Sequence, residues 1–154
     1  MANNECLMQY FEWYLPSDST LWNRVTKDSS HISNLGITHL WLPPAYKGQG
    51  GANDVGYGVY DLYDLGEFNQ KGSIPTKYGT KDEYLNAIKN LKENNIKVIA
   101  DIVLNHKLGA DECEEVIAIQ NDYDDRNIDT SNAKMIKAWT KYTFPRKRRN
   151  IFFF

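Results

Sequence analysis

The chain has 154 residues, of which 42% are hydrophobic, and it carries a formal net charge of −2. This composition is typical of a globular chain, and no run approaches the roughly 18 consecutive apolar residues of a membrane-spanning helix. Outside a basic stretch at residues 146–149 the balance is acidic, whereas nucleic-acid-binding proteins present a basic face. We therefore expect no nucleic-acid and no membrane partner, although a nucleic-acid module built on the basic stretch stays open as a distant alternative.

The N-terminus and the cysteines bear on the cellular compartment. Residues 1–5, Met-Ala-Asn-Asn-Glu, lack the basic start and the apolar run of about 7–15 residues that mark a secretory signal. We therefore expect a cytoplasmic protein. Cys6 and Cys113 lie far apart in the sequence, and two such cysteines in the cytoplasm are expected to stay reduced thiols.

The first part of the chain predicts alternating strands and helices. Residues 6–13 are predicted as a strand, although so short an apolar run does not separate a strand from a buried helix. Residues 20–36 place apolar side chains at helical spacing and end in a glycine, which predicts a helix. Residues 37–42 are predicted as a second strand, ended by two prolines because proline cannot donate to a sheet. A strand-helix-strand unit favours a parallel sheet.

A long loop and a second helix come next. Residues 43–79 are rich in glycine and tyrosine, and loops this long inside compact domains are usually functional or disordered. Residues 80–83, Thr-Lys-Asp-Glu, form a capping box, and the apolar positions that follow share one helical face. A second helix is therefore predicted to begin there. Beyond residue 106 the sequence is polar and has no strong period, so no further strand or helix is predicted.

Residues 97–106 are predicted as a buried third strand that ends in polar side chains. Alternation along a strand places Asp101, Val103 and Asn105 on one face. An unpaired polar group buried there costs roughly 1–3 kcal/mol, so each needs hydrogen-bond partners or a ligand. From the strand alone, a structural hydrogen-bond network and a functional site remain as alternatives.

Several segments resemble one protein family. Residues 97–106, Lys-Val-Ile-Ala-Asp-Ile-Val-Leu-Asn-His, resemble the first signature of the alpha-amylase family of glycoside hydrolases. Residues 42–80, with Asp-Val-Gly-Tyr-Gly at 54–58, resemble the second barrel loop of the liquefying and cytoplasmic-type bacterial alpha-amylases. With residues 8–14, Met-Gln-Tyr-Phe-Glu-Trp-Tyr, the resemblance is nearly continuous from about residue 6 to about residue 145.

The resemblance implies an α/β fold. Residues 1–106 would be the N-terminal part of a TIM (β/α)8 barrel, with three parallel strands and two helices. Residues 107–145 would begin a small domain that is inserted at the calcium junction. A complete barrel typically needs ~250 residues, so the chain is expected to be an N-terminal fragment. The family pattern stops after Pro145, and residues 146–154 are expected to be an aberrant tail, from a shifted reading frame or a gene-model error.

The resemblance also implies roles for four residues. Tyr57 would offer its ring to a sugar face, and His106 would bond glucose hydroxyls next to the scissile bond. Asp101 would support this site, and Asn105 would supply one of the several oxygen ligands that calcium needs. Each role has a structural alternative. Tyr57 could simply pack the loop, His106 could be a core histidine with satisfied hydrogen bonds, and Asn105 could cap the turn after the strand. Trp13 could line the same cleft but is assigned to the core, as is more common for an aromatic residue near a barrel strand.

The activity that the resemblance implies is that of an alpha-amylase. Such an enzyme hydrolyses internal alpha-1,4 bonds of starch, glycogen or maltooligosaccharides with retention, and calcium is its cofactor. Retaining glycosidases need two carboxyl groups about 5–5.5 Å apart. In this family they lie on strands after the inserted domain, and their motifs do not occur here, so no catalytic residue is assigned and the chain alone is expected to be inactive. A related alpha-glucosidase and a non-catalytic glucan-binding remnant are the alternatives.

Overall fold

A computed structural model describes residues 4–145. The chain divides into two compact units, Met1–Leu108 and Gly109–Phe154, and each is described by itself. The aberrant tail that the sequence predicts at residues 146–154 lies outside the described residues. Within the described part, no helix is long and apolar enough to cross a membrane.

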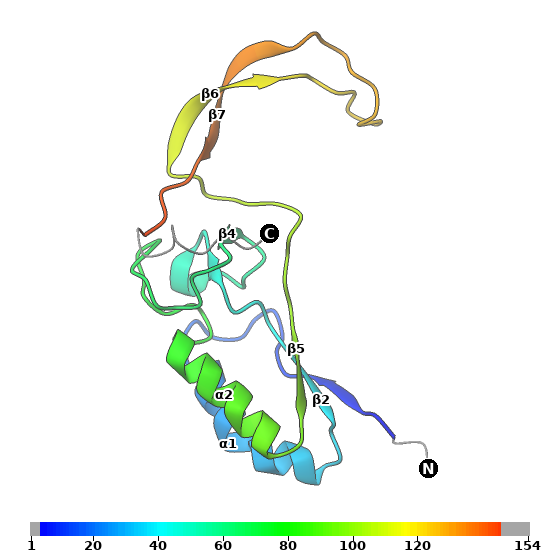
Figure 1. Cartoon of the computed structure of the whole chain (residues 1–154), viewed down its shortest axis with the longest axis vertical. Coiled ribbons are helices and arrows are strands. Elements are labelled where there is room, and N and C mark those ends of the chain that lie inside the picture. Colours follow the sequence, from blue (N-terminus) through cyan, green and yellow to red (C-terminus); the bar gives the residue numbers. More distant parts are fainter. Residues whose placement is uncertain (1–3, 146–154) are drawn as a thin grey trace. The chain divides into compact units, whose positions relative to one another are not determined.

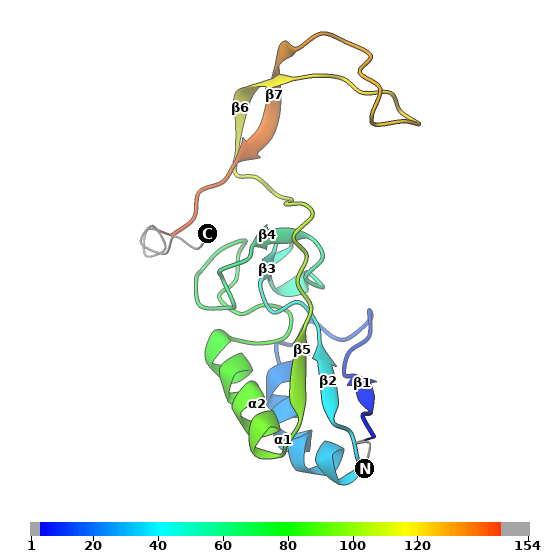
Figure 2. The ribbon, with the colours of Figure 1, turned by 45° about the vertical axis from the view of Figure 1, so that its right-hand side comes forward.

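The first unit contains a three-stranded parallel sheet. Its strands are β1 (Leu7–Gln9), β2 (His39–Leu42) and β5 (Lys97–Ala100), in the order β1-β2-β5. Figures 1 and 2 show β2 between its two neighbours. Leu40 of β2 is aligned with Met8 on one side and with Val98 on the other. The three parallel strands predicted from the sequence are confirmed.

Two helices, α1 (Leu21–Asn34) and α2 (Lys81–Glu93), pack together on one side of this sheet (Figure 2). Their apolar faces and the inward side chains of β2 form one buried core. The predicted capping box begins α2, since the Glu83 carboxylate accepts a 2.8 Å hydrogen bond from Thr80 N and Thr80 Oγ1 accepts from Glu83 N. The main buried side chains are Leu21, Trp22, Val25, Ile32, Leu40, Leu42, Tyr84, Ala87, Leu91 and Ile96. Both predicted helices are confirmed.

The third strand is shorter and more exposed than predicted. It ends at Ala100 rather than at residue 106, and three of its four residues are exposed. It is an outer strand of the described sheet and takes its hydrogen bonds from β2, which ends where Pro43 and Pro44 follow. Because prolines cannot continue the ladder, the chain beyond Ala100 loses its partner. The prediction of a buried ten-residue strand is wrong. Asp101, Val103 and Asn105 lie beyond the end of β5, so the alternation of a strand does not place them on one face. The first strand is likewise reduced to Leu7–Gln9, and all its residues are exposed.

Residues 43–79 are an ordered segment rather than a featureless loop. They contain a short antiparallel pair, β3 (Lys47–Gly48) and β4 (Val59–Asp61), and a 3-10 helix, η1 (Gly51–Asn53). The buried side chains of Lys47, Asp61 and Asp64 lie within this segment. Polar side chains therefore order it, which explains why its hydrophobic pattern is weak.

The described part of the second unit is a β-hairpin, which the sequence pattern did not predict. Its strands, β6 (Glu112–Ala118) and β7 (Lys134–Lys141), pair in antiparallel fashion. Most of their residues are exposed and none is buried, so no buried face imposes a period of two on the sequence. Opposite charges face each other across the strands, Glu112 with Lys141 and Glu115 with Lys137, and such cross-strand pairs stabilise a hairpin. Cys6 and Cys113 are both free and exposed.

Candidate functional site

The backbone around Tyr57 is held in one conformation. Gly56 has a φ of +98°, and a Cβ there would lie 2.5 Å from Cβ of Pro44, so only glycine fits at this position. The Asp54 carboxylate accepts hydrogen bonds from the N–H groups of Gly56 (2.8 Å) and Gly58 (3.2 Å). These contacts set the position of Tyr57 two residues before β4 begins.

The hydroxyl of Tyr57 is bonded to Asp101. It donates a 2.8 Å hydrogen bond to Oδ2 of Asp101, which directly follows β5. Burial raises the pKa of Tyr57 to about 12, with further contributions from the hydrogen bond to Asp101 and from its charge. The phenol therefore stays protonated at neutral pH and acts as a donor to the carboxylate. The structure brings together two of the residues singled out from the sequence, 44 positions apart.

His106 and Asn105 extend this group. Nε2 of His106 lies 3.0 Å from the carbonyl oxygen of Tyr57, and Nδ1 lies 3.3 Å from Nδ2 of Asn105. A carbonyl only accepts, so the network assigns the proton to Nε2 and leaves Nδ1 to accept from the Asn105 amide. Both side chains are exposed. A ligand hydroxyl would therefore share or replace one of these two contacts of the imidazole.

Trp13 lies against Tyr57, contrary to its assignment to the core. The two rings are stacked, with centroids 5.9 Å apart and planes 4° apart, and 59% of Trp13 is exposed. Trp13 comes four residues after β1, at the end of the sheet where the chain beyond β5 carries Asp101. Because functional residues of parallel barrels gather at the carboxyl ends of strands, the rule applied to Asn105 and His106 would also have selected Trp13.

An open hollow of about 360 Å³ adjoins the stacked pair. Aromatic rings dominate its wall, and the carboxylate-bearing side chain of Glu12 is also part of it. The lining residues are Gln9, Phe11, Glu12, Trp13, Trp41, Val55, Tyr57 and Tyr78. A sugar ring has apolar faces and hydroxyl edges, so aromatic walls next to hydrogen-bonding groups are chemically suited to it.

The calcium role of Asn105 can be compared with its surroundings. Calcium takes six to eight oxygen ligands, and residues 4–145 contain no group of three or more His, Cys, Asp or Glu side chains that could hold a metal ion. The Asn105 amide nitrogen faces His106, which leaves its oxygen as one possible ligand.

Comparisons with known proteins agree on one family. A family model described as the alpha amylase catalytic domain matches residues 20–149. The alpha-amylase of Geobacillus stearothermophilus is 57% identical over 142 residues, which cover 92% of this chain and 26% of that protein. The cytoplasmic alpha-amylase of Escherichia coli strain K12 is 49% identical over 92% of this chain and 29% of its own length. The chain thus spans just over a quarter of these curated relatives.

A solved structure resembles the fold of the chain. The truncated alternansucrase of Leuconostoc mesenteroides matches with a TM-score of 0.73 at 26% sequence identity. The match covers 90% of this chain and 13% of the alternansucrase chain.

Proposed function

The chain belongs to the alpha-amylase family of glycoside hydrolases, and from this premise we propose that it is the N-terminal part of the catalytic domain of a starch-cleaving alpha-amylase. The family's catalytic domain is a TIM barrel, and the sheet β1-β2-β5 with its two helices agrees with the first part of one. Starch, glycogen and maltooligosaccharides are the proposed substrates, and retaining hydrolysis of internal alpha-1,4 bonds is the proposed reaction.

One observation carries this proposal at the level of residues. Tyr57, Asp101 and His106 form one hydrogen-bonded group, and the ring of Trp13 lies beside it. The Trp13 and Tyr57 rings are proposed to pack against a pyranose ring, while Asp101 holds the Tyr57 hydroxyl in place. His106 is proposed to bond sugar hydroxyls through a nitrogen that it now uses within the chain.

These residues bind and orient a glucan but do not cleave it. Cleavage with retention needs a nucleophilic carboxylate and a carboxylic acid on the two sides of the scissile bond, and neither is assigned to residues 4–145. The residues beyond 106 are proposed to begin the inserted small domain, which the separate unit with the β6–β7 hairpin supports. Calcium binding at Asn105 is proposed with most of its ligands from outside the described residues. A cytoplasmic location is proposed from the similarity to the Escherichia coli relative of that name.

A hybrid enzyme tests the proposal directly. Residues 1–145 of this chain would replace the matched segment of the Geobacillus stearothermophilus alpha-amylase, which is 57% identical. We expect the folded hybrid to release reducing sugars from soluble starch, whereas residues 1–154 alone and the remainder of the relative alone should release none. Trp13→Ala and His106→Ala in the hybrid should each lower kcat/KM by about tenfold or more.

Three outcomes would contradict the proposal. A hybrid that unfolds cooperatively and binds maltohexaose without turnover would indicate a non-catalytic glucan-binding remnant. A hybrid that cleaves short or alpha-1,6-linked oligosaccharides but leaves soluble starch intact would indicate a related alpha-glucosidase. Unchanged kcat/KM in both variants would separate Trp13 and His106 from the glucan site.

A further inference from the structure

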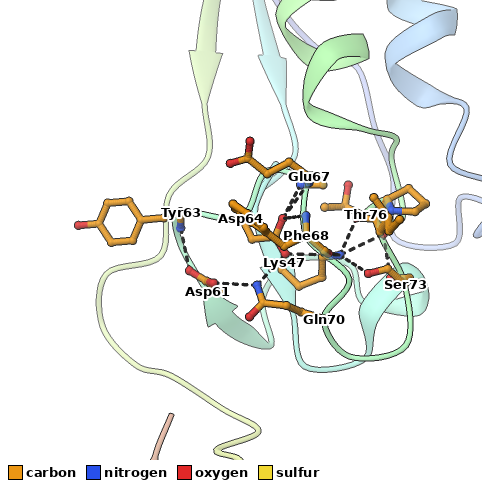
Figure 3. Close-up of polar contacts among 12 residues, drawn as sticks. Lys47, Asp61, Tyr63, Asp64, Glu67, Phe68, Gln70, Ser73 and Thr76 are labelled. Atoms are coloured by element: carbon orange, nitrogen blue, oxygen red, sulfur yellow. Dashed lines mark hydrogen bonds and ion pairs between the residues drawn. The ribbon is translucent and has the colours of Figure 1, made fainter. Parts of the chain in front are cut away.

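A cluster of buried charged side chains lies in the segment that carries Tyr57 (Figure 3). Lys47, Asp61 and Asp64 all have no exposed surface, and Gln70 is 92% buried, since 8% of it is exposed. Burying a charge is strongly unfavourable unless hydrogen bonds and an opposite charge compensate for the lost hydration. The contacts of each charge show how this cost is met.

The Lys47 ammonium is enclosed by backbone carbonyl oxygens. Nζ donates to the carbonyl oxygens of Ser73 and Ile74, both at 2.7 Å, and of Phe68 at 3.2 Å. An ammonium has three N–H groups, so each can be matched with one of these acceptors. The Asp64 carboxylate lies 3.6 Å away and supplies the opposite charge. Carbonyl oxygens that replace a hydration shell are the usual ligands of a desolvated monovalent cation, so Lys47 occupies a site of that chemistry.

Asp64 collects the opposite kind of backbone group. Gln70 Nε2 bridges its Oδ2 (2.8 Å) and Oδ2 of Asp61 (2.9 Å). Its Oδ1 accepts hydrogen bonds from three backbone N–H groups, those of Gly66 (3.0 Å), Glu67 (2.9 Å) and Phe68 (3.3 Å). Residues 64–74 are therefore folded around the Asp64 carboxylate and the Lys47 ammonium, and Gln70 of this segment also bonds the Asp61 carboxylate.

The surroundings of Lys47 are linked to the backbone on both sides of Tyr57. On one side, Lys47 pairs with Asp61 across β3 and β4, and β4 begins two residues after Tyr57. On the other side, Tyr78 comes four residues after Ile74, whose carbonyl oxygen is one of those that surround the Lys47 ammonium and form its carbonyl cage. The Tyr78 hydroxyl donates a 3.0 Å hydrogen bond to the carbonyl oxygen of Val55. A shift of the cage would therefore reach Tyr57 through both β4 and Val55.

We infer that Lys47 is a positioning residue, whose ammonium serves as a tethered cation and holds Tyr57 stacked on Trp13 and bonded to Asp101. The positioning of Tyr57 follows from contacts within the described unit. The consequence for glucan binding rests on the proposed function.

The first test compares two buried lysines in the full chain. Lys47→Met keeps the length of the side chain but removes its donors and its charge. Lys77→Met is the matched control. Lys77 is also buried and also lies within residues 43–79, but it donates to the Ser17 hydroxyl at 3.0 Å. The ring signals of Tyr57, assigned with Tyr57→Phe, would be followed by NMR in tyrosine-labelled protein, and maltohexaose affinity by calorimetry.

We expect Lys47→Met to shift the Tyr57 ring signals and to weaken maltohexaose binding by about tenfold or more. Lys77→Met should change neither by a comparable amount. Equal effects of the two variants, or a Lys47→Met chain with unchanged Tyr57 signals, would overturn the inference.

Chemical rescue separates a tethered cation from simple packing. Lys47→Ala would be measured with ammonium chloride and with tetramethylammonium chloride at the same ionic strength. Ammonium can donate to the carbonyl cage and should return the Tyr57 signals toward those of the unchanged chain, whereas tetramethylammonium has no N–H group and should not. Equal recovery with the two salts, or none with ammonium, would overturn the inference.

Two further measurements apply if the Lys47 variants do not fold or if the unchanged chain does not bind maltohexaose. If the Lys47 variants do not fold, the ammonium protons of Lys47 in the unchanged chain decide, since the cage requires slow exchange with water and fast exchange would contradict it. If the unchanged chain does not bind maltohexaose, glucan binding by this chain is refuted. Tyr57 signals that still depend on Lys47 and recover with ammonium would then support the positioning role alone.

Discussion

At the residue scale, the properties of the candidate site depend on a few side chains that hold one another. The stacked ring of Trp13, the carboxylate of Asp101 and the imidazole of His106 all contact Tyr57. Each contact joins Tyr57 to a residue more than 40 positions away in the sequence. The ring of Tyr57 is therefore oriented by tertiary contacts, and its titration is expected to report on them.

The titration of Tyr57 gives a pH-dependent prediction. Its pKa is raised from the usual 10.0 to about 12, chiefly by burial and then by Asp101. A folded-state pKa above the unfolded one means that the stabilisation is fully present below pH 10 and is lost as the pH rises toward 12. Tyr57→Phe should remove this loss, so that the stability of the variant falls less steeply over this range. Chemical denaturation at a series of alkaline pH values measures the difference, and parallel curves for the two proteins would contradict the prediction.

Alanine substitutions at two glycines with positive φ distinguish the cost of a strained backbone from the cost of a steric clash. Gly72 has a φ of +79°, and a Cβ added there would have no other atom within 4 Å, whereas at Gly56 the Cβ would collide with Pro44. We expect Gly72→Ala to cost about 1–2 kcal/mol of unfolding free energy, from the left-handed conformation alone. Gly56→Ala should cost more and should also displace Tyr57. Denaturant titration and the Tyr57 NMR signals check both, and equal costs would contradict the role of Pro44.

At the element scale, local signals and long-range contacts contribute differently. Helix α2 begins at a capping box formed within four residues of sequence. Strand β5 ends at Ala100, where its partner β2 gives way to two prolines. The order of the β3–β4 segment depends on Lys47, whose acceptors lie more than 20 residues away. Of these three features, only the start of α2 is determined by residues that are neighbours in the sequence.

The capping box supports a prediction for α2. Thr80→Ala removes the hydroxyl that accepts from Glu83 N, and loss of such a cap costs about 0.5–2 kcal/mol of stability. Ser30→Ala on the exposed face of α1 is the control, because it removes a hydroxyl without a capping role and alanine favours a helix. Thermal or denaturant unfolding should show a loss only for Thr80→Ala. A loss of the same size in both variants would contradict the capping role.

At the scale of the whole molecule, the groups proposed to bind glucan lie in the first unit, and an apolar part of its sheet is exposed. Leu7, Ile99, Ile102 and Leu104 are all exposed on or just beyond the outer strands. In a closed barrel such side chains are covered by further strands. The proposed catalytic carboxylates and most of the proposed calcium ligands likewise require residues beyond those described.

Calcium affinity tests this view of the whole molecule. Asn105 offers one oxygen, and no group of three or more acidic, histidine or cysteine side chains in residues 4–145 could hold a metal ion. Because calcium needs six to eight oxygen ligands, we expect the chain to bind it more weakly than about 10⁻⁶ M. Calorimetric titration with calcium chloride, with Asn105→Ala as the control, measures this affinity. Submicromolar binding would require an additional site.

The sequence by itself determined the family, the two helices, the parallel strands and the capping box at Thr80. These follow from local periodicity, short-range capping or long stretches of similar sequence. It also singled out Tyr57, Asp101, Asn105 and His106, although their roles stay predictions. It did not reveal the β6–β7 hairpin, whose exposed strands carry no hydrophobic alternation.

The tertiary structure alone decided where β5 ends, that Trp13 covers the ring of Tyr57, and which carbonyl groups enclose Lys47. Trp13 and Tyr57 stack although 44 residues separate them, and the Lys47 ammonium meets backbone groups whose direction no residue type encodes. Such contacts depend on how distant segments are packed together. A local pattern predicts which residues form an element, but only the packed fold determines which side chains meet at its ends.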